Sequence, residues 1–202
     1  MKLLLGTTNP AKIADYKKYL VHSKLELITL KDVGPSTDEP LEIGKTFEEN
    51  ALQKARFYAE RTEYPTLADD GGFEVDALDG RPGIESNRWV GPYGTDEDRI
   101  NKVLDLLKEA PREKRTARLR FVTIVYFPLE REQIKVEGKI EGFVTKKPSP
   151  KRIKGFPYRP IFYIPQFGKT MIDLTEKERD KLNYRKQACK ELLLKLEPWI
   201  NM

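Results

Sequence analysis

Two long segments with alternating residues, Ala117–Phe127 and Gln133–Val144, constrain the fold of this chain more than any other feature. Successive side chains of a β-strand point to opposite faces of a sheet, so this alternation predicts two long strands. A short connection separates the segments, and we expect the two strands to pair as an antiparallel ribbon.

Shorter elements are expected before and after this ribbon. Hydrophobic periodicity predicts helices at Pro10–Val21, Phe47–Arg61, Thr95–Glu109 and Glu176–Leu196. Strands are predicted at Lys2–Thr7, Leu25–Leu30 and Ile161–Ile164, and loops at 31–44 and 145–160. Helices alternating with strands around an antiparallel ribbon predict a mixed α/β fold in two lobes, with a ligand cleft between the lobes.

The composition predicts one soluble domain. The chain has 202 residues, of which 39% are hydrophobic and 34% charged, so we expect a single domain over residues 1–202 with a substantial core. No apolar run is long enough for a bilayer span, and the run after Lys2 is too short for a secretory signal. We therefore expect a cytoplasmic protein with no membrane partner.

The chain contains one histidine, His22, and one cysteine, Cys189. Because zinc sites built on these residues need several of them, such a site is excluded, and a histidine-activated nucleophile is disfavoured. Carboxylates, lysines, arginines and hydroxyls remain for catalysis. Together with a hard metal such as Mg²⁺, these groups suit phosphate substrates.

The formal net charge of +5 is compatible with nucleic acid or with a small polyanionic substrate. The basic residues are spread along the chain and form no RNA-binding signature with interleaved aromatic residues. The sequence therefore favours a small anion, and no stable nucleic-acid partner is expected.

The segment Leu67–Asp76 contains the strongest candidate for catalysis. A short apolar run stops at Asp69-Asp70 and Gly71-Gly72, and alternation then resumes. This pattern predicts that a strand delivers the acidic pair to a tip that a ligand can approach; the alternative is a hairpin with an acidic turn. Adjacent side chains of an extended chain point in opposite directions, so we expect different roles for Asp69 and Asp70.

The segment Thr7–Lys12 joins the first predicted strand to the first predicted helix. Asn9 is expected to cap the helix and Pro10 suits its first position, as in an ordinary strand-to-helix turn. The hydroxyls of Thr7 and Thr8, the exposed backbone N–H groups and Lys12 would also form a cradle for a triphosphate. The segment is not a Walker loop, because it lacks the glycines and the Lys-Ser/Thr pair.

A second polar group is expected on the helix that follows Thr46. Thr46 and Glu49 have the spacing of a capping box. Asn50 and Lys54 lie one helical turn apart, where they would either hold an anion or a metal-bound oxygen or face solvent. Glu42 would add a carboxylate from the preceding loop.

Two later motifs contain candidate binding residues. The turn around Phe156, Tyr158 and Arg159 would stack on a nucleobase or cap the core. The motif Asn183-Tyr184-Arg185 lies near the start of the C-terminal helix. Arg185 would donate to a carbonyl edge or a phosphate, or form a surface salt bridge.

The order of these motifs resembles the inosine triphosphate pyrophosphatase family, whose members hydrolyse non-standard purine nucleoside triphosphates to a monophosphate and pyrophosphate. The resemblance runs nearly end to end, through residues 7–12, 44–51, 67–76, 81–84, 86–89, 155–162 and 183–185. It implies an elongated α/β fold with a central twisted mixed sheet flanked by helices, and two lobes with a ligand cleft between them. It also implies a homodimer that requires Mg²⁺.

The resemblance further implies roles for individual residues. The turn at 7–12 would bind the triphosphate. Asp70 would bind the metal and activate water, with Glu42 as a second metal ligand, and Asp69 would support that site. Lys54 would neutralise charge that develops on the phosphates, and Asn50 would orient this face of the helix.

The chain departs from the family at the residues that would contact the base. Gly71 stands where the family has serine, and Arg179 where it has lysine. In the aromatic turn Pro157 replaces a glycine and Arg159 an aspartate, and 183–185 reads Asn-Tyr-Arg instead of Ser-His-Arg. Since arginine offers donors where aspartate offers acceptors, we expect a shifted base preference.

The sequence therefore predicts an Mg²⁺-dependent pyrophosphatase for non-standard nucleoside triphosphates, such as dITP, XTP or another modified base, that sanitises the nucleotide pool. Three alternatives stay open. They are a pyrophosphatase for modified pyrimidine triphosphates, a nucleotide-binding homologue without turnover, and a direct nucleic-acid binder.

Overall fold

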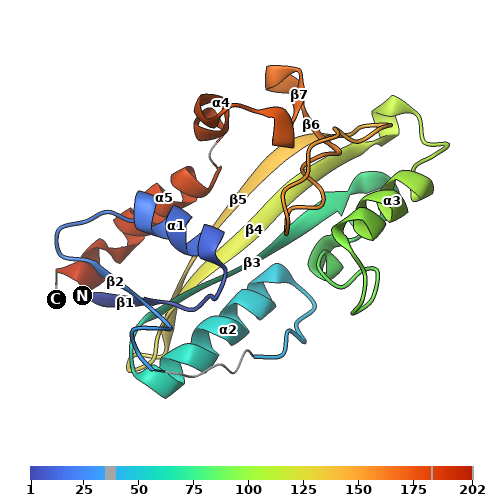
Figure 1. The fold of residues 1–202 in the computed structure, drawn as a ribbon. Helices are drawn as coiled ribbons and strands as arrows, with labels where there is room; N and C mark the ends of the chain where they lie inside the picture. Colours follow the sequence, from blue (N-terminus) through green and yellow to red (C-terminus); the bar gives the residue numbers. More distant parts are fainter. Residues whose placement is uncertain (35–39, 183, 202) are drawn as a thin grey trace. The chain divides into compact units, whose positions relative to one another are not determined.

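The computed structural model describes residues 1–34, 40–182 and 184–201 (Figure 1). The strands form a seven-stranded sheet with the order β2-β1-β3-β4-β5-β6-β7. These strands are β1 (Lys2–Leu5), β2 (Glu26–Thr29), β3 (Thr66–Val75), β4 (Thr116–Phe127), β5 (Glu132–Val144), β6 (Phe162–Ile164) and β7 (Lys169–Thr170). Strand β1 pairs in parallel with β2 and β3, whereas β6 pairs antiparallel with β5 and β7, so the predicted mixed α/β fold is confirmed.

The helices of the described residues are α1 (Pro10–Tyr19), α2 (Phe47–Thr62), α3 (Asp96–Leu106), α4 (Glu176–Lys181) and α5 (Tyr184–Ile200). The single helix predicted over Glu176–Leu196 is wrong, because α4 ends at Lys181 and α5 begins at Tyr184. Helix α4 buries no residue, whereas α5 buries a stripe that includes Cys189, Leu192 and Leu196. The apolar periodicity that suggested one helix therefore belongs to α5 alone. No helix within the described ranges is both long and apolar enough to cross a membrane.

The chain divides into two compact units. Unit 1 holds Met1–Asp70, Phe121–Gly138 and Tyr184–Met202, and unit 2 holds Gly71–Arg120 and Lys139–Asn183. The expectation of one domain with a ligand cleft between two lobes stays a prediction.

Helices cover both faces of the sheet strands in unit 1. Figure 1 shows α1 and α5 on one side of β1 and α2 on the other. The alternation of β1 explains this arrangement, because Leu3 and Leu5 pack with Tyr16 of α1 and Leu192 of α5. Between them, Leu4 points the other way and packs with Tyr58 of α2.

The acidic pair lies inside a strand, since β3 runs without interruption from Thr66 to Val75. Both the predicted tip and the alternative acidic turn are therefore wrong. In unit 2, a Cβ on Gly72 would lie 2.2 Å from the carbonyl oxygen of Gly83 and 2.4 Å from Oγ of Ser86. Gly72 thus allows the segment 83–86 to pack directly on an extended strand and does not turn the chain.

We predict that Gly72→Ala destabilises the protein by at least about 2 kcal/mol, because the new methyl group overlaps a backbone carbonyl. Urea unfolding followed by circular dichroism measures the change. Gly80→Ala is the comparison, because its Cβ has no neighbour within 4 Å although φ is +79°. Gly80→Ala should lower the free energy of unfolding by only about 1 kcal/mol, through backbone strain. A Gly72→Ala protein as stable as the parent would contradict this account of the acidic strand.

Candidate active site

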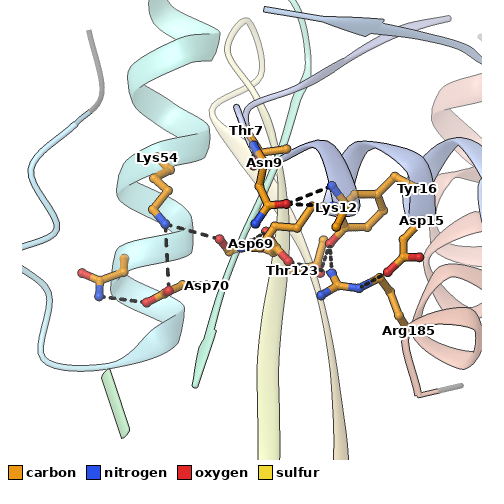
Figure 2. A network of polar contacts seen from close by, with 12 residues as sticks. Thr7, Asn9, Lys12, Asp15, Tyr16, Lys54, Asp69, Asp70, Thr123 and Arg185 are labelled. Carbon is orange, nitrogen blue, oxygen red and sulfur yellow. Dashed lines mark hydrogen bonds and ion pairs between the residues drawn. The ribbon is translucent and has the colours of Figure 1, made fainter. Parts of the chain in front are cut away.

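Charged and polar side chains from β3, α1, α2 and α5 gather in unit 1 around the acidic pair (Figure 2). Asp69 and Asp70 follow the buried residues Leu67 and Ala68 of β3. Because neighbours on a strand face opposite ways, the two carboxylates meet different elements.

Asp69 is held between two cations and its side chain is 1% exposed. The ammonium of Lys12 lies 2.7 Å from Oδ1, and Nη1 of Arg185 lies 2.7 Å from Oδ2. Burial raises the pKa of Asp69, but the Lys12 ammonium and the Arg185 guanidinium outweigh burial and hold this pKa well below its usual value. Asp69 is therefore ionised at neutral pH.

Arg185 is fixed from several sides in the interior of unit 1. Its Nη1 also donates to the hydroxyl of Tyr16 at 3.0 Å, and its Nε lies 3.3 Å from Oδ2 of Asp15. The guanidinium lies 4.6 Å from the ring centre of Phe121, and the hydroxyls of Tyr16 and Thr123 share a hydrogen bond of 2.9 Å. The Arg185 side chain is 12% exposed, so the surface salt bridge considered as an alternative is wrong.

Asp70 has a separate set of partners. Nδ2 of Asn50 donates to Oδ2 of Asp70 at 2.9 Å, and Nζ of Lys54 lies 3.9 Å from Oδ1. Asn50 is itself oriented by the Gly44 N–H group, which donates to its Oδ1 at 2.8 Å. The prediction that Asp69 and Asp70 point to different surroundings is confirmed.

Lys54 joins Asp70 to the preceding loop. Its ammonium pairs with the carboxylate of Glu42 and lies 3.5 Å from the backbone carbonyl oxygen of Asp69. Burial lowers the pKa of Lys54, but the carboxylates of Asp70 and Glu42 outweigh it and raise the pKa above its ordinary value. Lys54 is therefore a fixed positive charge beside Asp70.

Local capping sets the start of α2 and thus the face that carries Asn50 and Lys54. The Thr46 hydroxyl accepts from the Glu49 N–H group at 3.1 Å, which confirms the predicted cap. Glu49 reaches back to the N–H group of Lys45, at 2.6 Å, and the predicted capping box with Thr46 is wrong in that half. Asn50 is fully buried, so the solvent-facing alternative is wrong as well.

The turn at 7–12 has the predicted helix cap but fewer free donors than expected. Oδ1 of Asn9 accepts from the N–H groups of Ala11 and Lys12, at 2.9 and 3.3 Å. Oγ1 of Thr7 accepts from the Asn9 N–H group at 3.2 Å, and Thr8 is exposed. Asn9 therefore already accepts hydrogen bonds from some of the backbone N–H groups that were expected to bind a triphosphate. The main cation of the turn is Lys12, whose side chain is 27% exposed.

Tyr158, predicted to stack on a base or to cap the core, lies in the core of unit 2. It is 6% exposed, stacks on Phe73 with ring centres 4.8 Å apart, and donates from its hydroxyl to the Ser86 carbonyl oxygen at 2.8 Å. Burial raises its pKa above the ordinary value for tyrosine. This position agrees with the core-capping alternative.

The other residues expected to read the base are distributed over the chain. In unit 2 the guanidinium of Arg159 lies 3.7 Å from the ring centre of Phe156, and Arg179 donates to the Leu174 carbonyl oxygen at 2.8 Å. Gly71 directly follows Asp70 in β3, and in unit 1 the ring of Tyr184 lies 5.1 Å from that of Phe121. Asn183 lies outside the described residues. The role of these residues in base binding stays a prediction.

Three residues of the site were not predicted from the sequence: Asp15, Tyr16 and Thr123. Tyr16 follows Lys12 by one helical turn, and this i, i+4 spacing would have placed both side chains on one face of α1. Thr123 is a polar residue within a buried apolar run, which also indicates a partner nearby.

The carboxylates of Asp70 and Glu42 could hold Mg²⁺ only if other oxygens, such as those of a bound ligand, complete its coordination shell. Within the part of the chain that the structure describes, no group of three or more His, Cys, Asp and Glu side chains is arranged to hold a metal. Asp70 and Glu42 nevertheless both approach the ammonium of Lys54. Since Mg²⁺ takes one or two protein carboxylates and completes its shell with water and phosphate oxygens, this pair suits it when a polyphosphate is bound.

We predict that Asp69→Asn destabilises the protein by about 3 to 5 kcal/mol at pH 7, because it removes the buried carboxylate that pairs with both Arg185 and Lys12. The pKa of Asp69 is lower in the folded than in the unfolded state. Its stabilising effect is therefore complete above the unfolded value, about 4, and is lost as the pH falls through the folded value. Urea unfolding at pH 7 and pH 3 should show the parent losing more stability than the variant. Glu60→Gln, at an exposed position of α2, is the control. Equal acid sensitivity of parent and variant would contradict the assignment.

Comparisons with known proteins agree over nearly the whole length of the chain. The model of the Ham1 family matches residues 3–195. The dITP/XTP pyrophosphatase of Halalkalibacterium halodurans is 42% identical over 94% of this chain and 95% of the relative, and that of Bacillus subtilis is 39% identical over 96% of each. Among solved structures, the Ham1 protein of Coxiella burnetii superposes with a TM-score of 0.87 at 32% identity, covering 97% of this chain and 98% of the other. The nucleoside-triphosphatase of Mycobacterium abscessus, also named dITP/XTP pyrophosphatase, superposes with a TM-score of 0.80 at 37% identity, covering 96% of this chain and 99% of the other.

Proposed function

Because the chain belongs to the Ham1 family, we propose that it is a nucleoside triphosphate pyrophosphatase that hydrolyses non-standard nucleotides such as dITP and XTP to the monophosphate and pyrophosphate. The main structural support for this proposal is the set of contacts that Asp70 makes. This carboxylate is held by Asn50 at one oxygen and faces the Lys54 ammonium at the other. The name of the relative, dITP/XTP pyrophosphatase, supports this class of substrate, and the proposed biological role is removal of such nucleotides from the nucleotide pool.

In the proposed reaction Asp70 orients and deprotonates the attacking water. Nδ2 of Asn50 donates to Oδ2, and the ammonium of Lys54 on the same helix lies 3.9 Å from Oδ1, so the orientation of the carboxylate is set before water binds. A carboxylate is an acceptor when ionised, and it takes the proton that the water loses on attack. Asp70 is 8% exposed, and such a site strengthens the interaction of the carboxylate with charges around it.

Lys54 and Lys12 stabilise the polyphosphate. Cleavage that releases pyrophosphate builds negative charge on the departing oxygens, and fixed cations lower the cost of that charge. Lys54 is already held by Glu42 and Asp70, and Lys12 by Asp69, so little reorganisation is needed when the substrate arrives. Mg²⁺ held by Asp70 and Glu42 would add neutralisation of the phosphate charges when bound.

The proposal includes features that the family resemblance implies. These are a requirement for Mg²⁺ and a homodimer. The proposal also includes what the composition predicts: a single domain over residues 1–202, a cytoplasmic location, and no membrane or nucleic-acid partner. In the base-binding part, we propose that the aromatic turn with Phe156 and Arg159 contributes to base preference. The stacking of the Arg159 guanidinium on Phe156 supports this, because a cation over the ring gives the turn a rigid face.

A panel of triphosphates tests the proposed activity. We expect pyrophosphate release from dITP and XTP in the presence of Mg²⁺, loss of it with excess EDTA, and at least tenfold lower kcat/KM for the four standard dNTPs. Preferential turnover of modified pyrimidine triphosphates would select that alternative. Tight nucleotide binding without release of pyrophosphate would select the inactive homologue.

Replacement of the carboxylate tests the site. Asp70→Asn keeps the shape and should lower kcat by about 10² to 10³, because the acceptor for the water proton is lost. Glu60→Gln removes an exposed carboxylate from α2 and should leave kcat unchanged. Full activity of a folded Asp70→Asn protein would show that another residue has the catalytic role.

A further inference from the structure

Four charged side chains of alternating sign connect the surface of unit 1 with its interior. In order they are Asp15, Arg185, Asp69 and Lys12, and their ionic contacts measure 3.3, 2.7 and 2.7 Å (Figure 2). Asp69 and Arg185 are the buried members, with 1% and 12% exposure. The two ends are accessible to solvent, since 27% of the Lys12 side chain and 48% of the Asp15 side chain are exposed.

Arg185 changes the charge that Lys12 presents. An isolated ion pair between Lys12 and Asp69 would be neutral overall. Its buried carboxylate would compete with any phosphate for the Lys12 ammonium. Arg185 binds the other carboxylate oxygen and cannot lose its proton, so Lys12, Asp69 and Arg185 together carry a net positive charge. Asp15 is 48% exposed, and solvent therefore screens its opposing charge more strongly.

The guanidinium is anchored in place and faces Asp69. Its contacts with the Tyr16 hydroxyl and with the ring of Phe121 hold it from α1 and β4. Tyr16 is fixed in turn by Thr123. Lys12 and Tyr16 belong to α1 and Arg185 belongs to α5. The hydrogen bond from Arg185 to the Tyr16 hydroxyl therefore also sets where α1 lies against α5.

We infer that Arg185 is a positioning residue for polyphosphate binding, which acts through Asp69 to fix Lys12 and to leave its positive charge available to the ligand. The inference rests on the proposed function only in taking a polyphosphate as the ligand of Lys12. It gives Arg185 a role other than a direct contact with the base.

Calorimetric titration with inorganic pyrophosphate, in a fixed excess of Mg²⁺, tests this inference. Arg185→Met should raise the Kd at least tenfold, because Asp69 then neutralises Lys12. Arg185→Lys restores the charge without the planar fork and should stay within about threefold of the parent. The double variant Asp69→Asn with Arg185→Met removes the competing carboxylate too, and should recover most of the affinity.

Lys190→Met is the matched control, since it removes the same charge from an exposed position of α5 and should leave the Kd unchanged. Circular dichroism establishes that each variant is folded; Arg185→Gln replaces Arg185→Met if that protein does not fold. Parental affinity in Arg185→Met or Arg185→Gln would overturn the inference, as would a double variant as weak as the single one or a parent that binds no pyrophosphate. Absence of triphosphate hydrolysis together with the expected order of Kd values would count only against the proposed function.

Discussion

The site depends on the burial of one charged carboxylate, Asp69, between the cations of Lys12 and Arg185. An ionised carboxylate in a protein interior is unfavourable unless opposite charges and hydrogen bonds compensate it. The two compensating groups come from α1 and α5, so the start of each helix is tied to β3 at one point. This constraint places Lys12 beside the acidic strand and leaves part of its side chain exposed.

The alternation of β3 then determines what Asp70 meets. With Asp69 directed to α1 and α5, Asp70 faces α2, where Asn50 and Lys54 lie one turn apart. Lys12, Lys54 and Arg185 are therefore all fixed by carboxylates before any ligand binds. Charges that are placed in advance stabilise a reacting phosphate without the cost of reorganising flexible side chains. One strand thus serves two purposes, with Asp69 organising the cations and Asp70 carrying the proposed chemistry.

Features that depend on neighbouring residues in the sequence were predictable, such as the caps at Asn9 and Thr46 and the two long strands β4 and β5. The prediction of a tip at the acidic pair was wrong because Gly72 allows the segment 83–86 to pack on β3. No local sequence pattern predicts that contact. For Tyr16 the spacing from Lys12 gives its helix face, but its hydroxyl partner on β4 is 107 residues away in the sequence. Long-range packing, which a single sequence does not display, decides these features.

In the proposed reaction the nucleotide is cleaved so that pyrophosphate leaves intact. Phosphorus NMR of the reaction of dITP with the Mg²⁺-loaded protein measures this directly, because each product has its own resonance. We expect dIMP and pyrophosphate in equal amounts from the first turnover. Formation of dIDP and inorganic phosphate would contradict the proposed reaction.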